Sequence, residues 1–531
     1  MKHFLILFLL FCSVVATHGQ TNFLQKVVAV DRFSSEYFGM TTTISGNIAV
    51  VASPENVSDE NNSNLLSKAG AAYVYERVNN VWVQKQKLVA SDRAEQDYFG
   101  YSLDVEGNYI IVGAKQYRED ANGNELNNAP GAAYIFEKIN NSWMQVKKLI
   151  PADAKNGDWI GSSVKLSGNF AFVAAIGSDF NAQGTDSIYS AGAIYVFENT
   201  GNDWVERQKL VANDRHISAG LGWTMDVSGD YLITGLPFTE YPENNSNKLI
   251  DGGAAYVFKK VNGTWVQDVK LCAPILELGM QYGSIVIIEG DDLFVAATSE
   301  NGDNYSPAQL AYEGGAVYHY KNVNGAWTFQ QRVVAPDRAE DDVFGFGMAV
   351  EDDYLLVGSL TSTDTSNQNS ITMAGGVYLY SRINGTWNFT KKIVAPDRVQ
   401  YGLFGFSIAV SDSNVVVGAP YNSFDENGLN EIPLAGAAYF NNLNYLTSTI
   451  EISNPSLSVF PNPSSGMVSI NFSKKIGNNS TVKIYDITGA LINVYEVKNN
   501  VPLDLTTLAN GLYLIEINNG VERYQTKWIK E

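Results

Sequence analysis

The stretch DYFGYSLDVEGNYIIVGA, residues 97–114, has six relatives in the same 531-residue chain. Each relative is aligned by an apolar residue followed by glycine. These pairs are Phe38-Gly39, Phe99-Gly100, Ile160-Gly161, Leu221-Gly222, Tyr282-Gly283, Phe344-Gly345 and Phe404-Gly405. They recur every 60 to 62 residues, and self-similarity at a fixed period indicates a repeat architecture.

Two aromatic positions keep the same period. One is a tyrosine, at Tyr73, Tyr134, Tyr195, Tyr256, Tyr318, Tyr378 and Tyr439. The other is a tryptophan, at Trp82, Trp143, Trp204, Trp265, Trp327 and Trp387, with none in the seventh copy. The repeat therefore predicts equivalent buried positions in each copy.

Each copy predicts four short strands. In the second copy, residues 101–105 alternate in polarity, residues 109–113 and 132–136 are apolar, and residues 143–150 alternate again. Middle strands that are apolar on both faces must be covered on both sides, most simply by neighbouring copies in a ring. The sequence therefore predicts an all-β, seven-bladed β-propeller over residues 20–443. A solenoid fits a four-stranded unit less well.

The first segment of this predicted domain aligns with a fourth strand. Residues 21–32, TNFLQKVVAVDR, match residues 82–93, WVQKQKLVASDR, whereas the seventh copy ends near Leu443 without a fourth strand. We therefore expect the N-terminal strand to complete blade seven, because a closed ring removes edges that would otherwise pair with other chains.

The segments FGYSLDVEGNYIIVGA (99–114) and FGFSIAVSDSNVVVGAP (404–420) resemble the FG-GAP repeat propellers related to the head domain of integrin α chains. The resemblance covers about residues 21–443 and implies the propeller fold. Integrin-like members often carry an Asp-x-Asp-x-Asp-Gly calcium loop between the first two strands. Here that turn is only Ser45-Gly46-Asn47 or Ser228-Gly229-Asp230, so we expect those calcium sites to be absent.

The repeat stops after Leu443, and a polar linker over residues 444–456 leads to a second domain, residues 457–531. Its alternating segments predict a small Ig-like β-sandwich. The order VFPNP, YDITG and NGLYL is similar to the type A C-terminal sorting domain of the type IX secretion system of Bacteroidetes. The resemblance implies contact with the secretion machinery, export across the outer membrane and removal of the tail. The alternative is an accessory sandwich that stays attached.

The N-terminus predicts export as well. Residues 1–19 combine Lys2, an apolar run and small residues, as in a cleaved signal peptide. No later stretch is apolar for long enough to span a bilayer. The net charge of −20 and the pI near 4.7 argue against binding to nucleic acid, which needs clustered Lys and Arg. The expected location is therefore extracellular or on the outer-membrane surface.

Binding residues are expected on one face of the propeller, where the long loops between second and third strands meet the links between blades. Aromatic residues in those loops are the candidate ligand contacts: Tyr117, Phe180, Tyr241, Tyr305 and Tyr421. Solvated loops without a ligand would show the same composition, so this alternative stays open.

Two loops place oxygen ligands near a glycine, as calcium loops do. The candidate ligands are Asp120, Asn122, Asn124, Asp425 and Asn427. Neither loop has full EF-hand spacing, so the sequence favours either a weak calcium site or a simple turn. No other cofactor is expected.

The repeated Asp-Arg dipeptide, as at Asp31-Arg32 and Asp92-Arg93, predicts a brace between blades, because a catalytic site needs one asymmetric set of groups. Residues 20–531 hold two histidines, His216 and His319, at non-equivalent positions, which gives little support to a multi-His metal centre or a Ser-His-Asp set. We therefore expect a binding or adhesion protein for an extracellular protein or glycan, not an enzyme. The alternatives are a polysaccharide-active enzyme with paired carboxylates and a structural surface protein.

Overall fold

The computed structural model describes residues 25–116, 130–240, 249–301, 311–367 and 369–447, and in the C-terminal part residues 458–460, 464–471, 481–486, 491–496, 503–518 and 523–530. The chain divides into two compact units, Met1–Leu446 and Thr447–Glu531. The predicted signal peptide, residues 1–19, lies outside the described residues.

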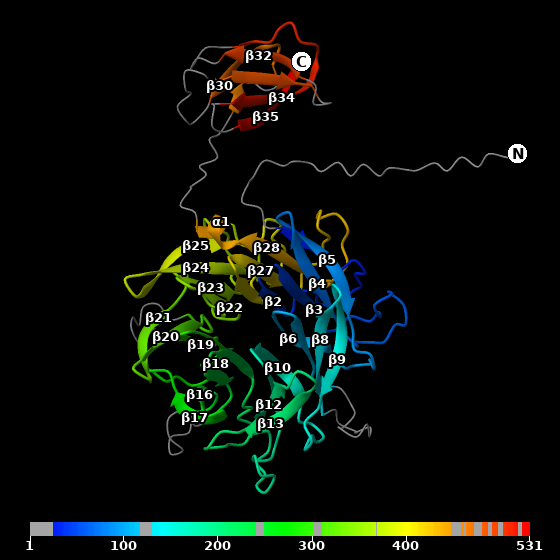
Figure 1. Cartoon of the computed structure of the whole chain (residues 1–531). Coiled ribbons are helices and arrows are strands. Elements are labelled where there is room, and N and C mark those ends of the chain that lie inside the picture. The colour runs from blue at the N-terminus through cyan, green and yellow to red at the C-terminus, as the bar shows by residue number, and fades with distance from the viewer. Residues whose placement is uncertain are drawn as a thin grey trace, which may run out of the picture. The chain divides into compact units, whose positions relative to one another are not determined.

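Within the described part of the first unit, the strands form seven antiparallel sheets of four strands each (Figure 1). In chain order the sheets are sheet 1, β2 (Thr42–Ser45), β3 (Ile48–Ser53), β4 (Ala71–Val78) and β5 (Val81–Leu88); sheet 2, β6 (Phe99–Glu106), β7 (Tyr109–Ala114), β8 (Ala132–Ile139) and β9 (Ser142–Leu149); sheet 3, β10 (Ile160–Ser167), β11 (Phe170–Ala175), β12 (Ala193–Asn199) and β13 (Trp204–Leu210); sheet 4, β14 (Thr224–Ser228), β15 (Tyr231–Leu236), β16 (Ala254–Val261) and β17 (Thr264–Leu271); sheet 5, β18 (Tyr282–Glu289), β19 (Asp292–Ala297), β20 (Ala316–Val323) and β21 (Ala326–Val333); sheet 6, β22 (Met348–Glu351), β23 (Tyr354–Ser359), β24 (Gly376–Ile383) and β25 (Thr386–Ile393); and sheet 7, β26 (Ile408–Ser411), β27 (Asn414–Ala419), β28 (Ala437–Asn442) and β1 (Gln25–Val27). The prediction of an all-β fold built from repeated four-stranded sheets is confirmed, with one short helix, α1 (Leu443–Thr447), after sheet 7.

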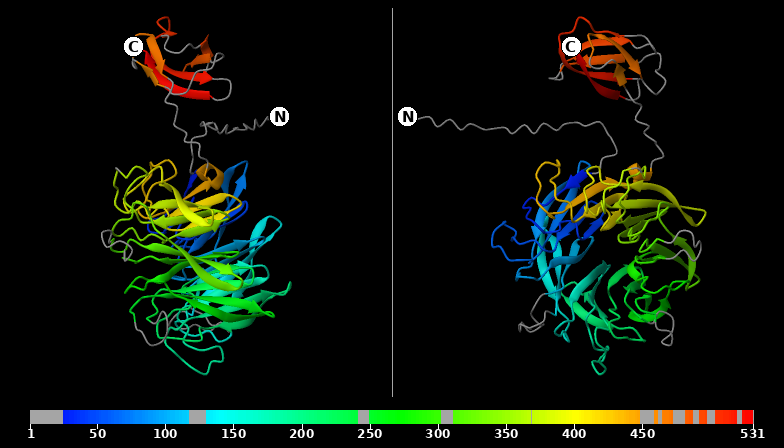
Figure 2. Two further views of the ribbon diagram at one scale, coloured as in Figure 1. Left: turned by 90° about the vertical axis from the view of Figure 1, so that its left-hand side faces the viewer. Right: turned by 180° about the vertical axis from the view of Figure 1, so that it is seen from behind.

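The N-terminal strand β1 belongs to the last sheet. It pairs antiparallel with β28, with Gln25 opposite Phe440 and Val27 opposite Ala438. The first strands of consecutive sheets pack against one another, and β2 packs against β26 as it does against β6. Seen from both sides, the sheets follow one another around a centre (Figure 2). This arrangement is consistent with a β-propeller.

Four of the seven fourth strands are joined to the next by a glutamine: Gln25, Gln86, Gln208 and Gln331. The side-chain amide of Gln86 in β5 donates to the main-chain oxygen of Trp143 in β9 (2.7 Å) and accepts from the main-chain nitrogen of Trp143 (2.9 Å). Gln25 of β1 makes the same two bonds with Trp82 of β5 (2.7 and 2.9 Å). The junction between sheets 7 and 1 therefore has the same hydrogen bonds as a junction inside the chain.

Five of the six repeated tryptophans are buried between sheets, and Trp327 is half-buried. Trp82 stacks on Phe440 of sheet 7, with ring centroids 4.6 Å apart, and Trp265 meets Phe172 of sheet 3 edge-on at 5.2 Å. Burial of such a ring stabilises the fold by about 2 to 3 kcal/mol. These residues hold the outer strands together.

The Asp-Arg dipeptide is a brace. Asp31 accepts hydrogen bonds from Tyr73 Oη (2.7 Å) and Lys87 Nζ (2.6 Å) of the following sheet. Arg32 instead donates to the carbonyl oxygens of Ser423 and Asn430 in the long loop of sheet 7. The aspartate thus binds the next sheet, while the arginine holds the long loop of its own sheet.

Sheet 5 replaces this brace with a different ion pair. Ile275 stands where the other links have aspartate, and the cation of β21 is Arg332. Arg332 Nη2 lies 2.7 Å from Glu300 Oε1, and Glu300 is buried in the loop after β19. The carboxylate has moved to another segment, but the buried cation keeps a partner, which a charge in the interior requires.

A second carboxylate, Glu36, lies buried beside the Asp31 brace. Its Oε2 accepts from Phe33 N (3.0 Å) and its Oε1 accepts from Asn56 Nδ2 (2.9 Å). Burial raises the pKa of Glu36 from 4.5 to about 7, although the hydrogen bonds from Phe33 N and Val57 N act in the opposite direction. Between pH 4.5 and about 7, the Glu36 carboxyl group is therefore protonated in the folded protein and ionised in the unfolded chain.

This raised pKa predicts a pH-dependent effect of Glu36→Gln. Between pH 4.5 and about 7 the folded state binds more protons than the unfolded state, so the contribution of Glu36 to the free energy of unfolding falls as pH rises. Glutamine does not titrate. Urea unfolding at about pH 5 and pH 8 should show the variant gaining about 3 kcal/mol relative to the wild type over that range. Glu95→Gln, at an exposed link position, is the control, and parallel pH profiles of Glu36→Gln and the wild type would contradict the prediction.

The second unit contains two further β-sheets among its described residues. One joins β29 (Ser458–Phe460), β30 (Met467–Asn471) and β33 (Leu503–Asp504). The other has the order β32 (Leu491–Glu496), β31 (Thr481–Tyr485), β34 (Gly511–Asn518) and β35 (Arg523–Lys530). Val468, Ile484 and Trp528 belong to one buried cluster that both sheets share.

Candidate binding site

The long loops and the links between sheets lie at one end of the strands. Each first strand begins at this end, and each second strand, antiparallel to the first, finishes there. The loops that follow the second strands and the links that precede the first strands therefore share it. We call this end the loop-rich face, and the opposite end, with the short turns, the turn face.

A cavity of about 440 Å³ lies at the centre around which the seven sheets are arranged, at the loop-rich face. Its lining comes from all seven sheets: Met40, Thr41, Tyr101, Ser162, Ser163, Ile176, Trp223, Thr224, Pro237, Phe238, Gln281, Ser284, Ile285, Thr298, Phe346, Gly347, Met348, Phe406, Ser407 and Ile408. We call it the axial cavity. Its size is that of a small-molecule site.

One repeat position supplies a lining residue from every sheet. It is the residue directly after the apolar-Gly pair: Met40, Tyr101, Ser162, Trp223, Ser284, Phe346 and Phe406. The pair is fixed because its glycine approaches the neighbouring sheet, whereas the next residue faces the axis and differs between copies. The cavity is therefore asymmetric although the scaffold repeats.

Five of the twenty residues in the wall are aromatic: Tyr101, Trp223, Phe238, Phe346 and Phe406. Trp223 meets Phe238 edge-on, with ring centroids 4.8 Å apart, and Phe346 lies 4.7 Å from Phe406. Trp223 keeps 37% of its surface exposed although it lines a cavity. Such rings offer flat apolar faces to a ligand.

The remaining wall is partly aliphatic and partly polar, without charged residues among those described. None of the described residues that line the axial cavity is Asp, Glu, Lys or Arg. Ser284 Oγ and Thr298 Oγ1 are 2.8 Å apart, and Ser407 Oγ donates to Gly39 O at 3.0 Å. Thr224 Oγ1 is buried and has no hydrogen-bond partner among the described atoms. The cavity thus combines aromatic faces with hydroxyl groups that bind neutral polar atoms.

The sequence did not predict these residues. Of the five predicted aromatic contacts, Phe180 and Tyr421 are described and neither lines the axial cavity. Phe180 lies under Lys155 Nζ, 3.3 Å from the ring centroid, and Tyr421 packs 5.1 Å from Tyr37. Tyr117, Tyr241 and Tyr305 lie outside the described residues. The signal that could have located the cavity is the variable residue after each apolar-Gly pair.

Comparison with protein families agrees with this geometry. The FG-GAP repeat matches residues 82–136, 143–197, 204–258, 327–380 and 387–440, more than half of the chain. The chain belongs to the FG-GAP repeat family. Each matched FG-GAP segment begins at the tryptophan of one fourth strand and ends in the third strand of the following sheet.

Residues 458–531 match the secretion system C-terminal sorting domain. This domain marks proteins that the type IX system exports to the cell surface or the extracellular space, so the FG-GAP protein is exported and interacts with that machinery. A search of curated proteins finds no match to the chain. Among the residues that the structure describes, no helix is long and apolar enough to cross a bilayer.

The predicted calcium ligand Asp425 organises its own loop in the FG-GAP domain. Its Oδ1 accepts from Asn427 N (3.0 Å) and Leu429 N (2.9 Å), and its Oδ2 accepts from Asn430. These hydrogen bonds, led by the one from Leu429, lower the pKa of Asp425 to about 2. Asp59 accepts the same backbone bonds in sheet 1, from Asn61 N and Ser63 N.

The calcium hypothesis stays a prediction for this loop. Asp425 and Asn427 belong to no group of three or more His, Cys, Asp or Glu, and the described residues hold no such group with metal-binding geometry. Asp120, Asn122 and Asn124, the other predicted ligands, lie outside the described residues.

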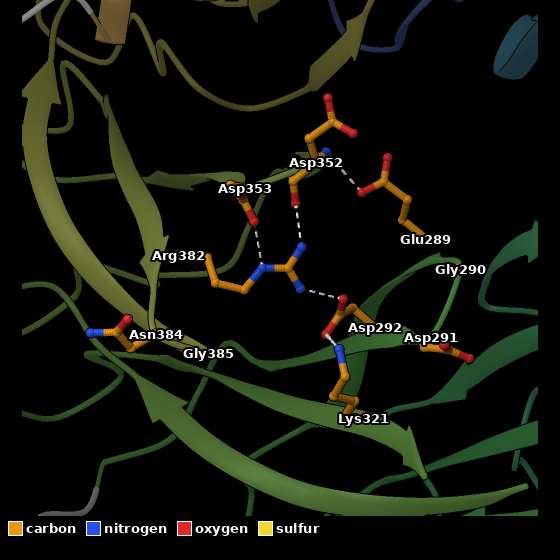
Figure 3. Close-up of a pocket in the computed structure, with 10 residues that line it drawn as sticks. All are labelled: Glu289, Gly290, Asp291, Asp292, Lys321, Asp352, Asp353, Arg382, Asn384 and Gly385. Atoms are coloured by element: carbon orange, nitrogen blue, oxygen red, sulfur yellow. Dashed lines mark hydrogen bonds and ion pairs between the residues drawn. The ribbon is translucent and has the colours of Figure 1, made fainter. Parts of the chain in front are cut away.

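A second pocket, of about 630 Å³, lies at the turn face between sheets 5 and 6 (Figure 3). Arg382 reaches across it to Asp292 and donates to Asp353 Oδ1 (2.7 Å) and Asp352 O (3.0 Å). Asp292 also lies 2.7 Å from the buried His319. Burial raises the pKa of Asp292, but its hydrogen bonds with His319 and Arg382 outweigh this and lower it to about 2. The paired charges of this pocket thus join two sheets of the FG-GAP domain.

Proposed function

We propose that this FG-GAP protein is an exported binding or adhesion protein, in which a closed seven-bladed propeller presents its ligand site on the loop-rich face and a C-terminal sandwich serves as the export signal. The pairing of β1 with β28 and the shared Gln-Trp contacts support closure. The sorting-domain match supports the role of the tail.

The axial cavity is the proposed centre of binding, and a neutral sugar residue is the ligand class that fits it best. The C–H faces of a sugar ring stack on aromatic side chains, while its hydroxyls bond to partly exposed polar residues of the lining such as Ser163 and Gln281. The uncharged lining disfavours sugars that carry carboxylates or phosphates, because a buried ion needs a partner. The single observation that carries the proposal is this wall of aromatic and hydroxyl groups without a charge.

We further propose that the protein binds without catalysis and without a cofactor. Glycoside hydrolysis needs two carboxyl groups beside the sugar, and the axial cavity has none among its described lining residues. The loop of Asp425 is supported by its own backbone N–H groups, which favours folding without calcium.

The test is a glycan array probed with the full chain, with and without calcium. We expect binding to neutral glycans, equal in both conditions, and none to sialylated or sulfated ones. Release of reducing ends from a bound glycan would show an enzyme instead, and the absence of any bound glycan would contradict the sugar assignment.

A further inference from the structure

Five large apolar side chains are exposed on the loop-rich face along sheets 3, 4 and 5, outside the axial cavity. Three lie in the long loops, where Tyr189 is 68% exposed, Ile250 52% and Tyr312 61%. Two lie in the links that follow, where Ile217 is 69% exposed and Leu278 63%. We call these five residues the apolar arc. A single exposed apolar residue is common on protein surfaces, whereas a group of them on one face indicates an interaction site.

The arc is specific to three consecutive sheets. Tyr189, Ile250 and Tyr312 occupy one repeat position, three residues before the glycine that precedes the third strand. In the other copies this position holds Ser67, Asn128, Thr372 and Pro433. Ile217 and Leu278 also share one position, which elsewhere holds Ser34, Glu95, Asn156, Glu340 and Gln400. The fold therefore does not require apolar residues at either position.

Backbone hydrogen bonds join the members of the arc in pairs. Ser218 N, next to Ile217, donates to Tyr189 O at 2.9 Å. Gly279 N, next to Leu278, donates to Ile250 O at 2.9 Å. Tyr189 and Ile250 in the long loops thus lie beside Ile217 and Leu278 in the links that follow. The hydrogen bonds between loop and link hold the backbone of both segments in place. A surface ordered in this way loses little conformational freedom on binding.

Acidic residues outnumber basic ones in and beside the segments that carry the arc. Segments 186–190, 216–220, 249–253, 276–281, 311–315 and 339–343 contain no Lys or Arg, while Arg215, Lys248 and Arg338 stand directly before three of them. Their acidic residues are Asp186, Asp251, Glu277, Glu313, Glu340, Asp341 and the buried Asp342. One of these, Asp186, pairs with Arg215 at 3.0 Å. An apolar centre within a charged rim is the usual composition of a protein interface.

We propose that the apolar arc is a protein-docking surface, separate from the axial cavity, and that its partner presents apolar side chains flanked by lysine or arginine. The acidic rim selects such a partner through complementary charge. A second copy of this face would bring like charges together, and a membrane with anionic lipids would be repelled for the same reason.

The test uses the full chain and two synthetic amphipathic peptides, one of leucine and lysine and one in which glutamate replaces each lysine. The wild type should bind the lysine peptide, more weakly as salt rises, and should not bind the glutamate peptide. The variant Tyr189→Ser, Ile250→Thr, Tyr312→Thr carries the residue types of other copies and should fold normally. We expect it to lose affinity for the lysine peptide by about tenfold or more.

Two control variants separate this surface from other apolar positions. Leu65→Ser removes a side chain that is exposed in the long loop of sheet 1, outside the arc, and should bind the lysine peptide as the wild type does. Trp223→Ser alters the axial cavity and should also leave peptide binding unchanged, so that failure of the cavity proposal and of this one are distinguishable.

Three binding results would overturn the docking proposal. The first is equal binding of the lysine peptide by the wild type and the triple variant, and the second is no binding of that peptide by the wild type. The third is binding of the wild type to zwitterionic vesicles, if the triple variant loses this binding as much as it loses binding of the peptide. The last would identify a lipid surface instead. Concentration-dependent dimerisation lost in the triple variant would identify a second copy and would likewise contradict it.

Discussion

Gly436→Ala is expected to abolish folding of the FG-GAP domain. Gly436 has φ +86°, and a Cβ added there would lie 2.1 Å from the carbonyl oxygen of Phe38. The two residues form a parallel bridge between sheets 7 and 1. Because the obstacle is backbone, the sheets must separate, at a cost of about 4 kcal/mol or more. Soluble expression and the urea midpoint of the full chain measure the effect.

Two matched glycines make this a test of ring closure. Gly131, at φ +85°, meets Ile160 O in the same way between sheets 2 and 3, so Gly131→Ala should be equally damaging. Gly263, at φ +84°, has open space around the added Cβ and should cost only about 1 kcal/mol of backbone strain. If Gly436→Ala behaves like Gly263→Ala, sheets 7 and 1 do not pack together.

Asp31→Ala is expected to lower the free energy of unfolding by about 3 to 5 kcal/mol. The side chains of Asp31 and Lys87 are 3% and 5% exposed and lie 2.6 Å apart. Burial raises the pKa of Asp31, but hydrogen bonds from Lys87, Ser58 and Tyr73 outweigh it and hold the pKa below its ordinary value. Removing the carboxylate leaves a cation buried without a counter-charge. Urea unfolding followed by tryptophan fluorescence measures the loss.

The double variant Asp31→Ala, Lys87→Met should recover much of that stability, because it removes the unpaired charge. Asp153→Ala is the matched control from sheet 3. Asp153 pairs with Lys209 at 2.8 Å, but its side chain is 43% exposed, so solvent screens the pair and the loss should be about 1 kcal/mol. Equal losses of unfolding free energy in Asp31→Ala and Asp153→Ala would contradict the claim that burial of the ion pair sets the size of the effect.

The repeat made the sheets predictable from sequence. The fixed spacing of the apolar-Gly pairs reflects a backbone contact that recurs at every junction, as at Gly131 and Ile160, where a side chain has no room. The alignment of residues 21–32 with a fourth strand depends on the same regularity, and Gln25 makes the contacts of Gln86. Because the same contacts recur at each junction between sheets, the residues that make them recur at a fixed spacing in the sequence.

The site was harder to predict because it lies where the repeat breaks. Phe180 and Tyr421 stay predictions as ligand contacts, and in the structure one packs under Lys155 and the other against Tyr37. Trp223 and Phe406 lie just before the first strands of their sheets, far apart in the sequence, and only the arrangement of the sheets brings both into one cavity. Convergence of equivalent positions from seven sheets is a property of the three-dimensional arrangement.

Titration calorimetry of the full chain with a neutral glycan selected on the array tests the central claim most directly. The account predicts that Trp223→Ser and Phe406→Ser, which introduce the residue that Ser162 and Ser284 already provide in other copies, each weaken binding by about tenfold, or about 1.4 kcal/mol. Affinities equal to that of the wild type in both variants would show that the ligand binds elsewhere.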